Sequence, residues 1–230
     1  MQNLAGRRPR TFALIPGAGG AAAYWQRLEP LLRAAGHDAV AVDLPGDDPK
    51  AGLAEYAALV AAAVDGRDDV VLVAQSMGGF TAPLVAARLP VSAIVFLNAM
   101  IPVPGETPAQ WWEATGQAEA LTAAAHVGGY SAEFDAETYF FHDLRPADVA
   151  ALSGDARPED EVAFQSACVF DGWPPVPIRV VAGADDRFFP ADFQGRVARE
   201  RLGVDADVLP GGHLAALSRP EALARYLVEL

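Results

Sequence analysis

Short apolar runs alternate with longer stretches of mixed apolar and polar residues along this chain. Apolar runs of this length are typical of strands buried within a sheet, and the longer stretches are typical of helices. The runs predict six strands, near Thr11–Ile15, Asp38–Val42, Val70–Ala74, Ala93–Leu97, Ile178–Ala182 and Asp205–Leu209. The longer stretches predict helices near Tyr24–Ala35, Leu53–Val64, Met77–Leu89, Ala191–Leu202 and Pro220–Val228. Such alternation predicts an α/β fold, with a mostly parallel six-stranded sheet flanked by helices on both faces.

The alternation stops between Ile101 and Pro177, where no strand pattern occurs. Trp111, Trp112 and the aromatic run Tyr139–Phe141 lie there among polar helical stretches. We interpret this region, about residues 102–176, as an inserted helical cap. The length of 230 residues and the hydrophobic fraction of 52% fit one domain, residues 1–230, with a substantial core.

Ser76 follows one predicted strand directly and precedes a predicted helix. Ala74 and Gly78 flank it two places away on either side, and small residues there let a strand turn sharply into a helix. This arrangement is the nucleophile elbow, usually written G-x-S-x-G, with Ala74 in place of the first glycine. A serine at a helix start can also be a simple N-cap, so the motif needs partner residues elsewhere.

An acid and a histidine follow Ser76 in the order Ser, Asp, His, each after a predicted strand. Asp185 and Asp186 follow the fifth strand, and a Pro-Gly-Gly turn after the sixth presents His213 on a loop. A serine hydroxyl needs a base to take its proton, and histidine suits this role because its ordinary pKa is near neutrality. A carboxylate then fixes the tautomer and orientation of the imidazole ring.

The other three histidines have plainer interpretations. His37 lies at a helix-to-strand junction, where we expect it to be solvated. His126 and His142 fall in the irregular middle of the chain, where surface exposure or cap packing is the expectation.

Because Ser76, an aspartate and His213 occur in this order, the chain resembles α/β-hydrolases of the small group that contains plant methyl-ester esterases and hydroxynitrile lyases. The similarity is carried by Pro16–Gly20 with Tyr24-Trp25, Asp43–Gly46, Gln75–Gly79, Gly183–Asp186, Gly212–Leu214 and Leu217–Pro220, which span almost the whole chain. The resemblance implies that Ser76 is the nucleophile and that His213 is the base and then the acid. It implies Asp186 as the orienting carboxylate, because the family pattern Gly-x-x-Asp-x-x-x-Pro fits Gly183, Asp186 and Pro190.

The oxyanion formed during acyl transfer needs hydrogen-bond donors that are fixed in advance. Met77 N–H is one candidate, because it lies at the start of the helix after the elbow, where backbone donors are unpaired. Ala18 N–H is the second, since it matches the residue after the family's His-Gly pair, although Pro16 replaces that histidine here. Trp111 and Trp112 are candidates to line the substrate pocket, and because neighbours on a helix point about 100° apart, at most one should face it.

Several alternatives remain open. Hydroxynitrile lyases of the group carry a lysine after the catalytic histidine, where this chain has Leu214, an apolar residue as in the esterases and a further candidate for contacting substrate. A haloperoxidase-like activity would use the same triad, and a ligand-binding protein could retain the fold without turnover. A fourth alternative is an NAD(P)-dependent oxidoreductase, because Gly17–Ala22 fits G-x-G-x-x-A with Asp43 about 20 residues on. That fingerprint leaves Ser76, Asp186 and His213 unexplained.

Composition and charge exclude further classes of function. The formal net charge of −13 argues against binding nucleic acid or an anionic membrane through a basic surface. The single cysteine, Cys168, permits neither an intramolecular disulfide nor a cysteine-based metal cluster. Met1–Arg10 lacks the apolar core of a signal peptide, and no uninterrupted apolar stretch is long enough to span a membrane, so we expect a soluble cytoplasmic protein.

The sequence thus predicts a serine hydrolase that cleaves a small carboxylic ester through an acyl-Ser76 intermediate, with no metal or cofactor. The identity of the ester is not readable from it. Some members of the resembling group dimerise, so a homodimer remains open.

Overall fold

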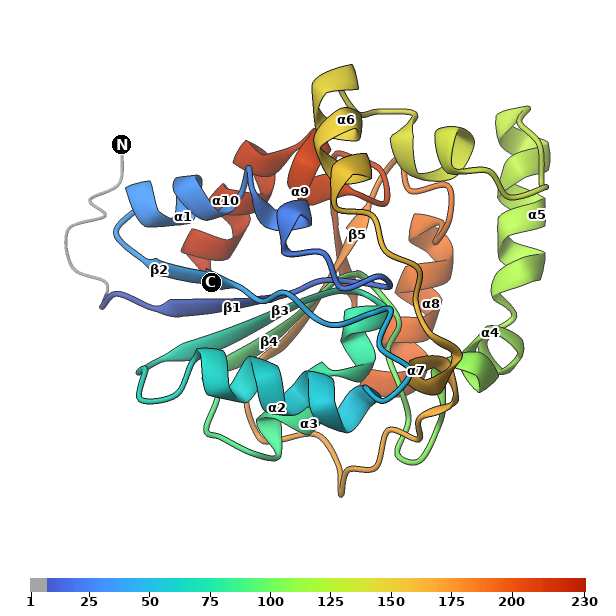
Figure 1. The fold of residues 1–230 in the computed structure, drawn as a ribbon. Helices are drawn as coiled ribbons and strands as arrows, with labels where there is room; N and C mark the ends of the chain where they lie inside the picture. Colours follow the sequence, from blue (N-terminus) through green and yellow to red (C-terminus); the bar gives the residue numbers. More distant parts are fainter. Residues whose placement is uncertain (1–7) are drawn as a thin grey trace.

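Six parallel strands form the centre of the molecule, in the spatial order β2-β1-β3-β4-β5-β6 (Figure 1). The computed structural model describes residues 8–230, so most of the Met1–Arg10 segment discussed above lies outside the described residues. The strands are β1 (Thr11–Ile15), β2 (Asp38–Ala41), β3 (Val70–Ser76), β4 (Ala93–Ala99), β5 (Ile178–Gly183) and β6 (Ala206–Leu209). The predicted parallel α/β sheet is therefore confirmed.

Burial explains why these segments are strands. All five residues of β1 are buried, as are the first six residues of β3, so both strands need apolar side chains on each face. The edge strands β2 and β6 are more exposed. Two central strands run two residues further than predicted, because β3 reaches Ser76 and β4 reaches Ala99. The strand β3 therefore ends on the candidate nucleophile.

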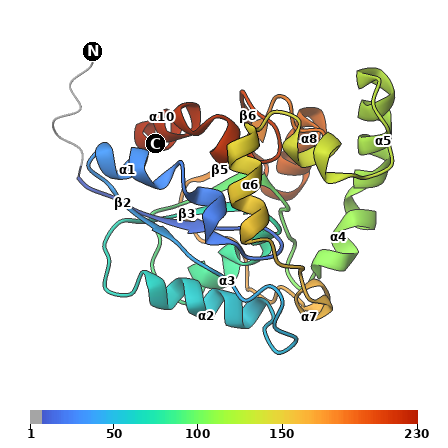
Figure 2. The same cartoon turned by 45° about the horizontal axis from the view of Figure 1, so that its top comes forward.

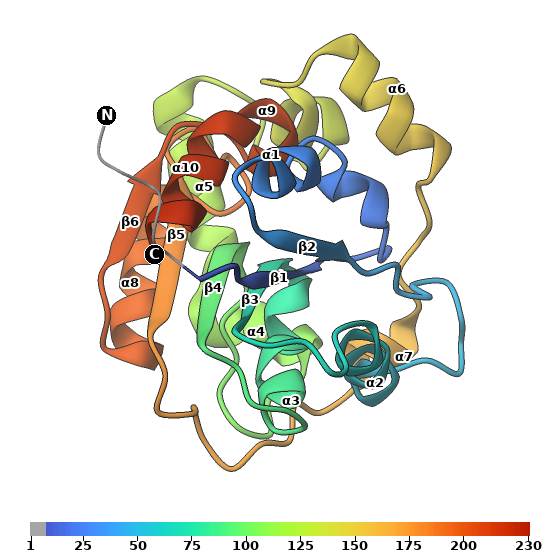
Figure 3. The same cartoon turned by 90° about the vertical axis from the view of Figure 1, so that its left-hand side faces the viewer.

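Helices cover both faces of the sheet, as Figure 3 shows. One face carries α1 (Glu29–Ala34) and α10 (Pro220–Glu229), whose Leu32 and Leu227 join the same buried cluster. The other face carries α2 (Leu53–Ala63), α3 (Ala82–Ala86) and α8 (Ala191–Leu202). The sheet is thus the middle layer of three.

Two predicted helices are interrupted. In place of Tyr24–Ala35, the structure has a short 3₁₀ turn, η1 (Ala22–Trp25), and then α1, whose second residue is Pro30. In place of Met77–Leu89, it has η2 (Met77–Phe80) and then α3, whose second residue is Pro83. Proline lacks the N–H that a helix interior requires and is tolerated in the first turn, so each proline marks a new helix start.

The segment from 102 to 176 contains helices and no strand among the residues described. These are α4 (Pro108–Thr115), α5 (Gln117–Gly128), the π-helical turn η3 (Glu137–Phe141), α6 (Pro146–Gly154) and α7 (Glu161–Gln165). A further short helix, α9 (Ala215–Ser218), follows β6. Figures 1 and 2 show α4 and α5 beyond the carboxyl ends of the strands, with α6 above the sheet. The interpretation of residues 102–176 as an inserted cap stays a prediction. Within residues 8–230, no helix has the length and apolar character needed to cross a membrane.

Candidate active site

Ser76 occupies a strained turn between β3 and η2. Its backbone angles are φ 50° and ψ −126°, a region that residues with a side chain rarely adopt. The turn is tightly enclosed, because a Cβ added at Gly78 would collide with the carbonyl oxygen of Pro16, and one at Gly79 with that of Met100. Ala74 is fully buried in β3, where its methyl group fits. Small residues therefore let the turn lift Ser76 above the sheet.

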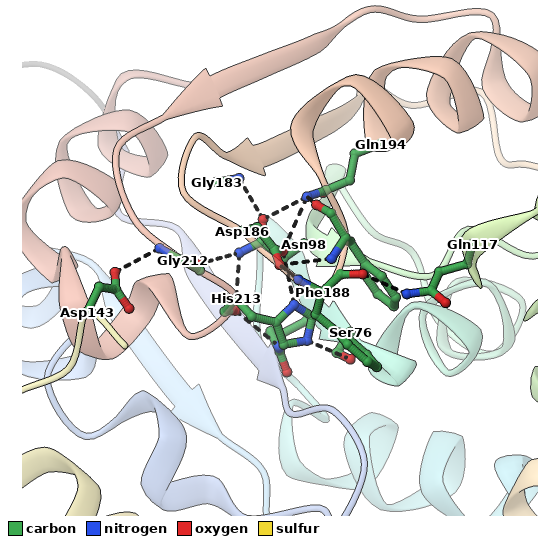
Figure 4. Close-up of polar contacts among 12 residues, drawn as sticks. Ser76, Asn98, Gln117, Asp143, Gly183, Asp186, Phe188, Gln194, Gly212 and His213 are labelled. Atoms are coloured by element: carbon green, nitrogen blue, oxygen red, sulfur yellow. Dashed lines mark hydrogen bonds and ion pairs between the residues drawn. The ribbon is translucent and has the colours of Figure 1, made fainter. Parts of the chain in front are cut away.

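His213 connects Ser76 to a carboxylate, as Figure 4 shows. Its Nε2 lies 3.1 Å from Ser76 Oγ, and its Nδ1 lies 3.0 Å from Asp186 Oδ2. His213 is 1% exposed and Asp186 is 5% exposed, so water competes little for either contact. With Nδ1 donating its proton to the carboxylate, Nε2 is free to accept from the serine hydroxyl.

The neighbouring aspartates of the β5 loop have separate contacts. Asp186 Oδ1 accepts hydrogen bonds from the backbone N–H groups of Phe188 and Phe189, both at 2.9 Å, which fixes the carboxylate. Asp185 is exposed, and its Oδ2 accepts the Gly211 N–H at 3.3 Å. The structure therefore brings Asp186, and not Asp185, against the imidazole.

Asn98 is a buried polar residue of this site that the sequence analysis did not identify. It has φ 45° and is skipped in the β3–β4 register, where Gln75 faces Leu97 and Ser76 faces Ala99. This bulge directs the amide into the loops, where Oδ1 accepts the Gly183 N–H at 2.6 Å and Nδ2 donates to the carbonyl oxygens of Gly212 and His213 (Figure 4). The sequence does hold one signal for Asn98, which is a polar residue near the end of an otherwise apolar strand.

Gln194 of α8 also contacts the Asp186 carboxylate. Its Nε2 lies 3.3 Å from Asp186 Oδ2 and 3.2 Å from Asn98 Oδ1, and the side chain is buried. Nothing in the helical pattern of α8 distinguishes this glutamine, because its role comes from a contact between distant parts of the chain.

The region of residues 102–176 contacts His213 directly. The Phe140 ring stacks on the His213 ring with centroids 5.0 Å apart and planes 18° apart. Asp143 Oδ2 accepts the Gly212 N–H at 2.8 Å, which anchors the loop just before His213. The orientation of His213 is thus set by packing as well as by Asp186.

The other histidines lie elsewhere. His37 is half-buried, accepts the Arg10 N–H at 3.2 Å and packs edge-on against Phe12, so our expectation of a merely solvated residue was wrong. In the tertiary structure the junction between α1 and β2, which carries His37, packs against β1. His126 is exposed in the last turn of α5, and both ring nitrogens of His142 are buried without a hydrogen-bond partner in the described structure.

A cavity of about 210 Å³ opens at Ser76 and His213. Most of its wall is apolar, with Tyr24, Phe141 and Leu214 among the lining residues. Leu214 is therefore placed where the sequence analysis expected it.

The two tryptophans are not among the residues that line this cavity. Trp111 is fully buried, its Nε1 donates to the Ile101 carbonyl at 3.2 Å, and its ring packs on Phe189. Trp112 packs edge-on against Phe188. Both side chains thus join α4 to the body of the protein, and the aromatic residues of the cavity wall come from η1 and η3 instead.

The candidate oxyanion donors lie on either side of the nucleophile. Ala18 is exposed and lines the cavity, and within residues 8–230 no acceptor is bonded to its N–H. Met77 is the first residue of η2, where helical N–H groups lack intrahelical partners. Gly17 lies against the elbow, because a Cβ there would be 2.8 Å from Ser76 Cβ.

Asp43, the acidic residue of the dinucleotide fingerprint, is engaged within the protein. Both carboxylate oxygens accept from the Arg157 guanidinium, at 2.7 and 2.9 Å, and Oδ1 also accepts the Ala22 N–H. The Arg157 hydrogen bonds hold the pKa of Asp43 below its ordinary value. The contacts of this carboxylate thus join Asp43 to Arg157 and to the start of η1.

Among residues 8–230, no group of three or more His, Cys, Asp or Glu side chains is arranged to hold a metal ion. Cys168 is buried, its thiol lies 3.2 Å from the Phe80 carbonyl oxygen, and burial raises its pKa to about 12. Such a thiol is a packing group and not a nucleophile.

Comparison with known families agrees with this geometry. The model of the alpha/beta hydrolase family matches residues 12–226. The chain belongs to this family. Two relatives illustrate the range of similarity for this α/β-hydrolase. Norfluorocurarine synthase 1 from Strychnos sp is 23% identical over 261 aligned positions, covering 100% of this chain and 98% of that protein. Probable esterase PIR7A from Oryza sativa subsp. indica is 38% identical over 108 residues, 41% of each chain.

A solved structure shares the fold of this α/β-hydrolase. The crystal structure of polyneuridine aldehyde esterase superposes with a TM-score of 0.77 at 20% sequence identity, covering 96% of this chain and 99% of that one. At this identity the likeness establishes the fold and leaves the substrate to be argued from the site.

Proposed function

We propose that this α/β-hydrolase cleaves a small, uncharged carboxylic ester through an acyl-Ser76 intermediate. The observation that carries the proposal is the contact of 3.1 Å between His213 Nε2 and Ser76 Oγ, at the base of an open cavity. The names of two similar proteins, a probable esterase and polyneuridine aldehyde esterase, support ester hydrolysis as the reaction class.

In the acylation step, Ser76 Oγ attacks the ester carbonyl carbon while His213 Nε2 takes the hydroxyl proton. A bond forms between Oγ and carbon, and the carbonyl π electrons move onto oxygen. The N–H groups of Ala18 and Met77 would stabilise this oxyanion. The intermediate then collapses, the carbon–alkoxy bond breaks, and the imidazolium returns its proton to the leaving alcohol.

Deacylation repeats these steps with water. His213 takes a proton from the water as its oxygen attacks the acyl carbon, and the second tetrahedral intermediate expels Ser76 Oγ, which recovers the proton. Asp186 stabilises the imidazolium in both halves without taking its proton. The products are a carboxylic acid and an alcohol.

The charges around the cavity favour an uncharged substrate. Arg157 lines the cavity but its terminal nitrogens are bonded to Asp43, and His213 is paired with Asp186. An anionic substrate would therefore find no unpaired cation among these side chains. Apolar groups of the ester would contact the wall formed by Phe141, Leu214 and their neighbours.

Pre-steady-state hydrolysis of p-nitrophenyl acetate tests the acyl-enzyme. We expect a burst of p-nitrophenol close to one equivalent of enzyme, followed by slower turnover, and no burst from Ser76→Ala. Steady turnover that Ser76→Ala leaves intact would show that another group performs the reaction. Cleavage of mandelonitrile without ester hydrolysis would indicate the lyase alternative instead.

A further inference from the structure

The loop of residues 16–20, which carries Ala18, is held in place mainly by contacts with other parts of the chain. Pro16 has neither a backbone N–H nor a polar side chain, so the first residue of the loop offers no donor to hold it in place. Gly19 and Gly20 both have positive φ, of 82° and 71°, a conformation that is rarely rigid by itself. Within the loop, the described structure has one hydrogen bond, from Gly20 N–H to the Gly17 carbonyl at 3.1 Å. The remaining support must come from elsewhere in the chain.

That support comes from the strap, residues 157–160, which connects α6 to α7. Glu159 Oε2 accepts the Gly19 N–H at 2.5 Å, across 140 positions of sequence. The same carboxylate accepts the Tyr56 hydroxyl on Oε1 at 2.6 Å, so its two oxygens join α2 to the loop. Burial raises the pKa of the Glu159 carboxyl above its ordinary value.

The backbone of the strap reinforces this contact. A Cβ on Gly19 would lie 2.5 Å from the Arg157 carbonyl oxygen, so strap and loop touch directly. The Asp160 N–H donates to the Gly46 carbonyl at 2.6 Å, and the Leu44 N–H donates to the Gly20 carbonyl at 2.9 Å. The loop is therefore held between the strap on one side and the Leu44–Gly46 turn on the other.

We infer that Glu159 is a positioning residue for the oxyanion hole, holding the Ala18–Gly19 peptide so that the Ala18 N–H stays directed at the reacting carbonyl oxygen. The geometric reason is that the Gly19 N–H belongs to the peptide unit directly after Ala18, and fixing this unit limits rotation about the Ala18 backbone. Oxyanion stabilisation depends on donors that are already oriented when charge develops. This inference rests on the proposed function and adds a residue that neither the triad nor the elbow contains.

Its test compares Glu159→Ala and Glu159→Gln with the wild type. The readouts are kcat and KM for p-nitrophenyl acetate, and Ki for an aryl trifluoromethyl ketone, whose adduct with Ser76 places an oxyanion in the hole. We expect Glu159→Ala to lower kcat and weaken Ki in parallel by about 10-fold or more, with KM within about twofold of wild type. Glu159→Gln retains an acceptor for the Gly19 N–H and should recover most of both losses.

Two further variants separate this role from general destabilisation. Glu161→Ala removes an exposed carboxylate two residues away and should leave all three constants unchanged. Tyr56→Phe removes one of the two hydrogen bonds on Glu159 without deleting the carboxylate, and its effect on kcat and Ki should be smaller than that of Glu159→Ala. If Glu159→Ala fails to fold, the comparison of Tyr56→Phe and Glu159→Gln still tests the inference.

If folded Glu159→Ala kept the wild-type kcat and Ki, the inference about Glu159 would be overturned and the proposed function would stand. A rise in KM with kcat preserved, or a Glu159→Gln variant as impaired as Glu159→Ala, would also overturn the inference, since neither result fits an acceptor that positions the loop. An inactive wild type that also fails to bind the ketone would overturn the proposed function, and the inference with it.

Discussion

At the residue scale, the site depends on a few side chains in demanding positions. Ser76 and Asn98 both have positive φ, and they lie on neighbouring strands where the β3–β4 register shifts so that Ser76 faces Ala99 and Asn98 is skipped. Conformations of this kind cost about 1–3 kcal/mol each and persist only when the surrounding contacts enforce them. Ser76 and Asn98 are thus held in their conformations at some expense in stability.

The elbow strain predicts different stabilities for two inactive variants. Ser76→Ala and Ser76→Gly both lose the hydroxyl, but only glycine adopts φ 50° without a Cβ penalty. We expect Ser76→Gly to exceed Ser76→Ala by roughly 1 kcal/mol in free energy of unfolding. Urea denaturation of both proteins measures the difference, and equal stabilities would mean that the turn is not strained.

The two adjacent aspartates should respond differently to the loss of charge. Asp186→Asn leaves the size of the side chain unchanged but removes the carboxylate that fixes the His213 tautomer, so we expect kcat to fall by roughly 10³-fold to 10⁴-fold. Asp185→Asn changes an exposed side chain that does not contact His213, and its amide oxygen can still accept the Gly211 N–H, so it should keep nearly full kcat. Steady-state kinetics on one ester compares them, and the opposite ranking would reverse the assignment of the acid.

At the element scale, strands were easier to predict than helices because burial on both faces leaves an uninterrupted apolar run. The predicted helix boundaries were wrong near Pro30 and Pro83, because each proline lies at the start of a new helix within an apparently continuous pattern. The lining of the cavity was harder still. Trp111 looked like a pocket residue and is buried against Phe189, while Phe140 stacks on His213, and no local pattern separates the two.

Helix α6 illustrates an anchor that sequence periodicity does not reveal. Asp148 accepts two hydrogen bonds from Arg145, at 2.7 and 2.8 Å, and lies 3.5 Å from Arg27 next to η1. The Arg145 hydrogen bonds hold the pKa of Asp148 below its ordinary value. The Arg145 hydrogen bonds are local to the start of α6, and the Arg27 contact is the one that attaches α6, which contributes Leu152 to the cavity, to the body of the protein.

This anchor predicts a pH-dependent contribution to stability. Because the pKa of Asp148 is lower in the folded state, its contribution is present above the ordinary aspartate pKa and is lost as pH falls through the folded value. We expect Asp148→Asn to cost about 1 kcal/mol at pH 7, and the gap to wild type to narrow as pH falls below the ordinary aspartate pKa. Thermal unfolding of both proteins across this range provides the measurement. A gap that is constant or widens on acidification would contradict the assignment.

At the scale of the whole molecule, most of the fold could be predicted, as could the convergence of Ser76, Asp186 and His213, because the carboxyl ends of β3, β5 and β6 lie at the same edge of a parallel sheet. The hydrogen bonds from Gly183 to Asn98, from Gln194 to Asn98 and from Gly19 to Glu159 could not, since each joins segments far apart in sequence. Such pairings leave no periodic trace. They are also the contacts that connect the region of residues 102–176 and α8 to the catalytic loops.

The net charge of −13 should affect which esters are used. Long-range repulsion and a cavity without a free cation both disfavour a negatively charged substrate. For a neutral ester and an anionic one of similar size, we expect kcat/KM to favour the neutral ester at low salt. The gap should narrow as added salt screens the field. A preference for the anionic ester that salt diminishes would show that a cation attracts it.

The central claim is that Ser76 is an activated nucleophile, and intact-protein mass spectrometry after fluorophosphonate treatment tests it most directly. The comparison uses the wild type, Ser76→Ala and His213→Ala. The account predicts one adduct per wild-type chain and none on Ser76→Ala or His213→Ala over the same exposure. An unlabelled but folded wild type, or an adduct that persists in Ser76→Ala, would contradict it.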